Sequence, residues 1–208
     1  MNASQIVPIA RAVAFAGLII PLVLTGCRKG GGEFSLPQDV CLLTGDLVLR
    51  SGTGVDSHAI TAADSGCPYS HIGMVVNIEG QPFVIHIVPD SSNAGSDTVR
   101  LDCIEDFFHP RRATHGLICR VGKVDSARRR ALEETSLSLH GKGLAFDRSF
   151  NTLDHSAFYC TELIWYIYKE AAGIDLTQSR RHTLPLLPPL IFCSDITGYN
   201  DKELIYKF

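Results

Sequence analysis

Apolar residues follow two different periods along this chain. Runs rich in β-branched and aromatic residues indicate strands, and a hairpin is predicted where Glu-Gly-Gln-Pro separates two such runs. The expected strands lie at 45–52, 72–78, 83–88, within 97–109, and at 114–122 and 203–208. Helices are expected at 56–65, capped by Asp56 or Ser57, at 125–142, and from about Cys160 to Gly173. Because strands and helices are largely segregated, the pattern predicts an α+β fold with an antiparallel sheet.

The helix in HSAFYCTELIWYIY is apolar almost all the way round. Tyr159, Leu163 and Ile167 share one face at helical spacing, and Cys160 and its helical neighbours lie on the adjacent face. A helix that is apolar on so many sides is expected to be buried in the middle of a domain. Cys160 in its first turn is either a packing residue or a reactive thiol whose pKa is lowered by the helix N-terminus.

The first 39 residues differ in composition from the rest of the chain. An apolar run from Ala12 to Leu24 follows Arg11, which is the shape of a secretory signal. The quartet ending at Cys27 resembles a bacterial lipoprotein lipobox, which implies a diacylated Cys27; an ordinary signal peptide or an anchor helix are the alternatives. The expected organisation is a signal peptide (1–26), a lipidated cysteine with a glycine-rich tether (27–39), and one domain (40–208).

Composition excludes some partners. The net charge of the 208 residues is −3, without the basic excess of nucleic-acid-binding proteins. Beyond Cys27 there are six cysteines, and they form no CxxC pair or zinc-ribbon spacing. We therefore expect no metal and no other cofactor, although disulfides remain open in an exported protein.

Two histidines join Cys160 as candidates for chemistry. If the strands pair about Gly80, then His71 and His86 lie near the open end of the hairpin, close together but not directly opposite. Acyl transfer by cysteine needs a thiol, an imidazole beside it and a group that orients the imidazole. This assigns Cys160 as nucleophile, His71 as base and acid, and His86 as the orienting residue. A zinc site built from the same three residues is an alternative.

Four blocks of the sequence resemble a known family. GDLVLRSG, SHAITAADSGCPYSHIGMVV, FVIHIV and GLAFDRSFNTLDHSAFYCTELIWYIY are similar to the permuted papain-like amidases of the YaeF/YiiX group, within the NlpC-like superfamily. The resemblance spans roughly residues 42–170 and implies a circularly permuted papain-like fold, with His71 as base and Cys160 as nucleophile. It also places Asp46 and Asp147 near the substrate cleft, although a turn role is favoured for Asp46 and equally open for Asp147. Tyr159 flanks Cys160 and is a further candidate for the cleft, although packing or local hydrogen bonding is favoured for it.

The third catalytic position departs from that group, whose amidases often carry glutamate where this chain has His86. Histidine there resembles the lecithin retinol acyltransferase branch of the superfamily. The leading hypothesis is a lipid-anchored cysteine hydrolase of the bacterial cell envelope that cleaves amide bonds in peptides or peptidoglycan fragments. The alternatives are a thiol-dependent lipid acyltransferase or acyl hydrolase, and an inactive binding lipoprotein.

Overall fold

One antiparallel sheet organises the protein. The computed structural model describes residues 34–64, 67–89, 97–183 and 188–208. The sheet has six strands in the order β4-β3-β2-β1-β5-β6, and every neighbouring pair is antiparallel. The strands are β1 (Leu47–Ser51), β2 (His71–Ile78), β3 (Gln81–His86), β4 (Arg100–Cys103), β5 (His115–Val121) and β6 (Lys202–Lys207). The predicted α+β class with an antiparallel sheet is confirmed.

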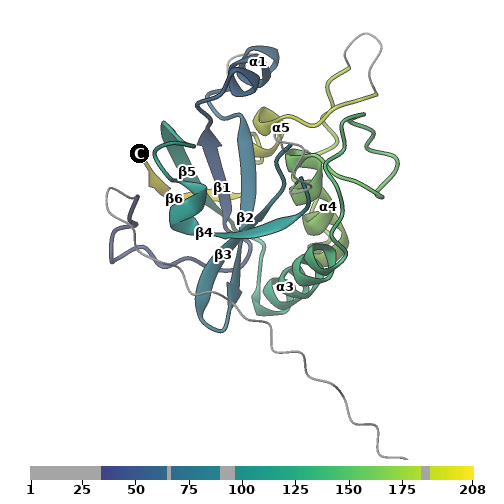
Figure 1. Cartoon of the computed structure of the whole chain (residues 1–208). Coiled ribbons are helices and arrows are strands. Elements are labelled where there is room, and N and C mark those ends of the chain that lie inside the picture. The colour runs from purple at the N-terminus through teal and green to yellow at the C-terminus, as the bar shows by residue number, and fades with distance from the viewer. Residues whose placement is uncertain (1–33, 65–66, 90–96, 184–187) are drawn as a thin grey trace, which may run out of the picture.

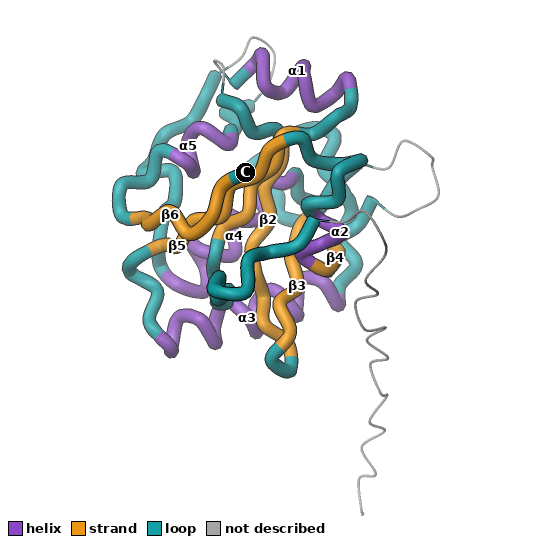
Figure 2. The backbone as a smooth tube through the Cα atoms, turned by 90° about the vertical axis from the view of Figure 1, so that its left-hand side faces the viewer, coloured by secondary structure: helices purple, strands orange, loops and turns teal. Residues whose placement is uncertain are grey.

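Helices cover both faces of this sheet. The helices are α1 (Val55–Ala63), α2 (Ile104–Phe107), α3 (Ser126–Gly141), α4 (Cys160–Ala172) and α5 (Cys193–Thr197). Helices α3 and α4 pack together on one face (Figure 1), where Leu132 and Leu163 meet Leu47 in the main core. The short helix α2 lies beside β4 (Figure 2) and supplies Phe107 to a smaller core on the opposite face.

Helix α4 is the buried helix that the sequence predicts. Leu163, Ile164 and Tyr168 have no exposed surface. The helix ends at Gly173, whose φ of 67° is in the left-handed region that glycine adopts without strain. Its N-terminus is thereby fixed by core packing on nearly every side, so a side chain on its first residue has a rigid support.

The predicted hairpin of β2 and β3 is also present. Glu79 and Gly80 form its turn with φ values of 51° and 80°, and Val75 lies opposite Val84. This register carries His71 and His86 to the same end of the sheet. Strand β3 ends at His86, two residues earlier than expected.

Three features differ from the expectations or lie outside them. The cap of α1 is Gly54 rather than Asp56 or Ser57, and α5 is a short helix that the apolar pattern did not indicate. Phe34, six residues before the expected domain start, packs against Phe108 and Phe208. The signal sequence and Cys27 lie outside the described residues.

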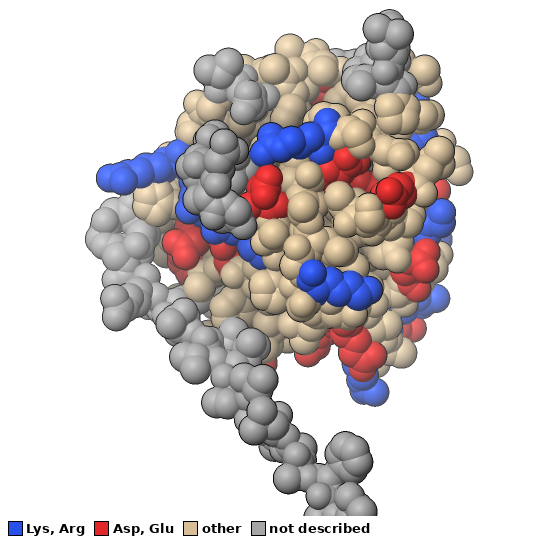
Figure 3. All heavy atoms as spheres, turned by 45° about the vertical axis from the view of Figure 1, so that its right-hand side comes forward, with Lys and Arg blue, Asp and Glu red and all other residues tan. Residues whose placement is uncertain are grey.

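The described surface has no dominant charge on the face seen in Figure 3, where acidic and basic groups are interspersed among uncharged ones. Within the described ranges, no helix has the length and apolar character needed to cross a membrane.

Candidate active site

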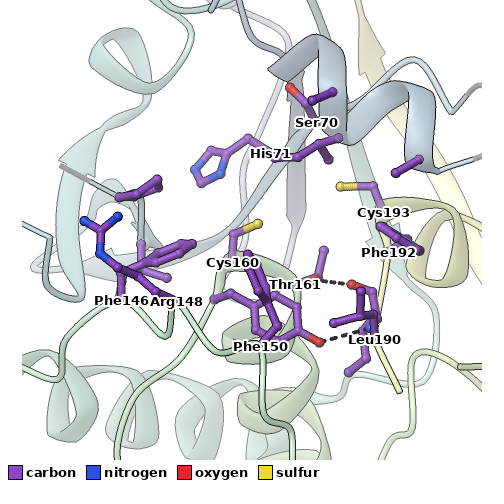
Figure 4. Close-up of a pocket in the computed structure, with 17 residues that line it drawn as sticks. Ser70, His71, Phe146, Arg148, Phe150, Cys160, Thr161, Leu190, Phe192 and Cys193 are labelled. Carbon is purple, nitrogen blue, oxygen red and sulfur yellow. Dashed lines mark hydrogen bonds between the residues drawn. The ribbon is translucent and has the colours of Figure 1, made fainter. Parts of the chain in front are cut away.

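A cavity of about 580 Å³ opens beside the N-terminus of α4. Cys160 and His71 both line it, and Figure 4 shows the Cys160 side chain below His71. Cys160 carries a free thiol and is partly exposed to the cavity. The first residue of the buried helix and the first residue of β2 therefore border the same cavity.

The two histidines are in direct contact. His71 Nε2 lies 3.0 Å from His86 Nδ1, and both side chains are buried. Gly73 makes room for this arrangement, because a Cβ at this position would lie 2.4 Å from Val84 Cγ1 and 3.3 Å from His86 Cβ. The expected proximity of the two imidazoles is confirmed, and the contact leaves Nδ1 of His71 as the nitrogen for a third partner.

The chain of contacts continues to Asp102 on β4. His86 Nε2 lies 3.1 Å from Asp102 Oδ2. The approach is close but not linear, since Nε2 has no partner in hydrogen-bond geometry. Arg100 contacts Oδ1 of the same carboxylate through Nε and Nη2 at 3.0 and 2.9 Å, and Arg112 reaches Oδ2 at 3.2 Å. Burial would raise the pKa of Asp102, but His86 and Arg100 outweigh it and hold this pKa well below its usual value, so the carboxylate is charged.

Arg50 and Phe107 border the histidine pair on the face of the sheet that also carries α2. Arg50 lies directly opposite His71 in the pairing of β1 with β2. Its guanidinium donates to the carbonyl of Phe107 and lies 4.6 Å from the centre of that ring. The same ring packs against both imidazoles, with centroids 5.5 Å from His71 and 5.2 Å from His86. A buried cation thus stands next to the histidine pair.

This environment keeps both imidazoles neutral. Burial lowers the pKa of His71 well below 6.5, and the Arg50 cation lowers it further. Burial likewise lowers the pKa of His86 to about 4, although contact with Asp102 works in the opposite direction. A neutral imidazole has one nitrogen that can accept a proton, which is what a general base requires.

The thiol of Cys160 is also neutral at rest. Burial raises its pKa to about 11 and outweighs the backbone N–H groups of Ile72 and Thr161, which lower it. The expectation that the helix start lowers this pKa is therefore wrong for the resting protein, because desolvation of a thiolate costs more than these N–H groups recover. The contact with Ile72, the neighbour of His71, also shows how closely the sulfur approaches β2.

The other residues expected near the cleft have different places. Tyr159 lines the cavity, and its hydroxyl accepts a hydrogen bond from the backbone N–H of Ile191 at 3.0 Å. Asp147 caps a turn by accepting from the backbone N–H of Ser149 and Asn151, and it does not line the cavity. Asp46 lies at the other end of β1, fully buried and paired with Arg120 at 2.8 Å. Its carboxylate ties β1 to β5 and is not part of the cleft.

Sequence reasoning missed Asp102 and Arg50. Asp102 lies in the short run Arg-Leu-Asp-Cys, where its alternation with Leu101 places it on the same face as Arg100. That alternation indicates which residues share a face of the strand, but the register of β4 against β3 depends on the intervening loop. Arg50 reads as the polar end of a strand, and nothing local indicates that it is buried.

The chain was compared with known proteins. No family model and no curated relative matches it. Its fold is similar to the crystal structure of metalloprotein YiiX from Escherichia coli O157:H7, with a TM-score of 0.67, 19% sequence identity, and coverage of 80% of this chain and 97% of the other. The chain therefore has the YiiX fold. Within the described residues, no group of three or more His, Cys, Asp or Glu side chains is placed to hold a metal ion.

Proposed function

We propose that the protein is a cysteine hydrolase that cleaves amide bonds through a thioester on Cys160. The observation that carries this proposal is the continuous series of contacts from His71 through His86 to Asp102, starting at the cavity wall where Cys160 lies. A neutral thiol and a neutral, buried and oriented imidazole that line one cavity supply the groups that general-base activation of a cysteine needs.

Each group then has one role. Asp102, a charged acceptor, favours the proton of His86 on Nε2, so Nδ1 of His86 accepts from Nε2–H of His71. Nδ1 of His71 is left with its lone pair and takes the thiol proton as the Cys160 sulfur attacks the substrate carbonyl. The same proton passes to the leaving amine when the C–N bond breaks, and water then cleaves the thioester. Backbone N–H groups of the first turn of α4 stabilise the oxyanion.

The name of the structural neighbour raises the question of a metal, and the residues here do not fit one. Two nitrogens that share a tetrahedral zinc ion at about 2.0–2.1 Å are separated by about 3.3 Å or more. His71 Nε2 and His86 Nδ1 are 3.0 Å apart and face each other, which is a direct hydrogen bond. No step of the mechanism therefore involves a metal.

The proposal is tested by trapping the acyl-enzyme in the full chain. Incubation with an activated amide or ester, followed by acid quench and peptide mass spectrometry, is expected to place the acyl group on Cys160. His71→Ala is expected to abolish the label, whereas Cys41→Ser, which removes an exposed thiol, is expected to leave it unchanged. A label on Cys193, or turnover that survives Cys160→Ala, contradicts the proposal.

We further propose that lipid on Cys27 anchors this hydrolase to a membrane of the bacterial envelope. The support is the apolar run followed by a lipobox-like quartet. Metabolic labelling with a palmitate analogue is expected to mark the wild-type chain and not Cys27→Ser. Equal labelling of both proteins contradicts the anchor.

A further inference from the structure

A second cavity, of about 590 Å³, lies beside α5. Its lining has no hydrocarbon side chain and consists of Arg180, Arg181, His182, Asp195, Ser179, Ser194 and one glycine. None of these residues lines the catalytic cavity. A cavity with such a lining is suited to a charged ligand, and its arginines determine the sign of that charge.

The two arginines have no carboxylate partner within the described residues. No ion pair in this part of the chain involves Arg180 or Arg181. The one carboxylate in the wall, that of Asp195, has both oxygens engaged elsewhere. Its Oδ1 lies 3.1 Å from His182 Nε2, and its Oδ2 accepts from the backbone N–H of Phe192 at 2.8 Å. The positive charge of the arginines is therefore not matched by an ion pair.

Neutral groups hold both guanidinium groups in place. Arg180 Nη2 donates to the backbone carbonyl of Asp195 at 2.6 Å. Arg181 Nη1 donates to the backbone carbonyl of Arg180 at 2.6 Å and to the hydroxyl of Thr177. The Arg181 guanidinium also lies 4.7 Å from the centre of the Trp165 ring. Because these partners carry no charge, they fix the side chains without cancelling their positive charge, and an anion that binds there has less ordering to impose.

The backbone before the two arginines is strained. Gln178 and Ser179 have φ values of 52° and 66°, in the left-handed region that residues other than glycine rarely adopt. Asp175 stabilises this turn by accepting from the backbone N–H of Ser179 at 2.9 Å. On α5, a Cβ at Gly198 would lie 2.9 Å from Arg180 Nη2, so the glycine leaves room for this guanidinium. Such strain persists only where the surrounding structure maintains it, and it is typical of ligand-binding segments.

From these contacts we infer that the cavity beside α5 binds a phosphate group. This site goes beyond the proposed hydrolase and does not depend on it. Hydrogen bonds within the described residues use two N–H groups of each arginine, of the five that a guanidinium has. The remaining N–H groups suit the oxygens of a phosphate, and the hydroxyls of Ser179 and Ser194 add donors in the same wall. A free phosphate and a phospholipid headgroup share this chemistry, and the test separates them.

The test is calorimetry on the full chain at neutral pH and fixed ionic strength. One probe is inorganic phosphate, and the other is glycerophosphoglycerol, which is the headgroup of phosphatidylglycerol without its acyl chains. We expect saturable binding of at least one probe with a Kd of about 1 mM or lower. Binding of inorganic phosphate alone identifies a site for free phosphate, whereas binding of glycerophosphoglycerol identifies a headgroup site. Absence of saturable binding of both probes overturns the inference.

Variants then locate the bound anion. Ser179→Glu adds a carboxylate at an exposed position of the wall and is expected to weaken binding at least about tenfold, because this carboxylate competes for the arginines. Ser138→Glu, the same change at an exposed position of α3 outside this cavity, is the matched control and is expected to bind as the wild type does. Arg181→Gln is a second variant with an expected loss, and a thermal melt of each protein separates loss of fold from loss of binding. Cys160→Ala is expected to keep full affinity. Equal affinities of the two glutamate variants, or loss of binding in Cys160→Ala, would place the anion elsewhere, for example beside Arg148 in the catalytic cavity, and would overturn the inference without affecting the proposed hydrolase.

Discussion

The charge and geometry of Asp102 should control which nitrogen of His71 is basic. Asp102 only accepts, so it fixes the proton of His86 on Nε2 and, through the 3.0 Å contact, the proton of His71 on Nε2. A hydrogen bond to a charged group contributes about 1.5–3 kcal/mol, and the non-linear approach of Asp102 to His86 Nε2 is taken at the lower end of this range. We expect kcat/KM to fall by about tenfold in Asp102→Ala, since 1.36 kcal/mol corresponds to a factor of ten.

Asp102→Asn should lower kcat/KM more than Asp102→Ala does. Arg100 contacts Oδ1 through two nitrogens, so it will hold the amide oxygen of an asparagine there and turn the NH₂ group toward His86. His86 then has to accept on Nε2 and donate from Nδ1, and His71 carries its proton on Nδ1, the nitrogen meant for the thiol. We expect kcat/KM of Asp102→Asn to be at least about tenfold below that of Asp102→Ala, because the wrong tautomer costs a catalytic base more than an unspecified one.

The assay is kcat/KM with one activated substrate over pH 5–9, together with ¹⁵N chemical shifts of the His71 and His86 ring nitrogens, which report the tautomers directly. Asp106→Asn is the matched control, since Asp106 is exposed on the adjacent helix α2 and its side chain is outside the series of contacts from His71 to Asp102. Equal rates for the alanine and asparagine variants, or unchanged histidine tautomers in Asp102→Asn, refute the reasoning. A thermal melt of each variant separates loss of fold from loss of tautomer.

Three further outcomes follow from the burial of the site. Alkylation of Cys160 by iodoacetamide is expected to have its midpoint near pH 11, and a midpoint below 8 refutes a neutral resting thiol. The pKa of His86 falls from 6.5 to about 4 on folding, so the unfolded chain binds more protons between these two pH values. The free energy of unfolding should keep its full value above pH 6.5 and drop by about 3 kcal/mol on acidification to pH 4. The same pH dependence of this free energy in urea unfolding of wild type and His86→Gln contradicts the prediction. Phe107→Ala should cost about 3–5 kcal/mol in urea unfolding and raise the histidine pKa values measured by NMR, because water reaches both rings; unchanged values rule out this ring as their shield.

The sequence predicted the parts of the site that depend on local pattern. The 3.6-residue period placed Cys160 at the start of a buried helix, and the Glu-Gly-Gln-Pro turn set the register that joins His71 to His86. Asp102 could not be placed in the same way, because its position depends on how β4 pairs with β3 after a long connection. A local sequence pattern predicts which face a residue lies on and where a turn occurs, whereas the pairing of strands distant in sequence is set by packing of the whole sheet.

The direction of the pKa shift of the thiol could not be predicted from local pattern, for a related reason. A helix N-terminus favours a thiolate. How much water the thiol retains depends on residues distant in sequence, among them Phe150 and Ile191 in the walls of the cavity. Burial by these elements raises the pKa of the thiol and so favours its neutral form.

One property of the site controls its chemistry. The apolar walls of the cavity raise the pKa of Cys160 and lower that of His71. In such surroundings a resting thiolate–imidazolium pair is disfavoured, because both ions lose hydration. Proton transfer becomes favourable only when the sulfur attacks a carbonyl and the negative charge moves to an oxyanion held by backbone N–H groups. A substrate that fills the cavity excludes the remaining water and strengthens those N–H interactions. Substrates that fill more of the cavity should consequently gain in kcat as well as in KM, whereas a gain confined to KM would mean that the extra contacts contribute binding alone.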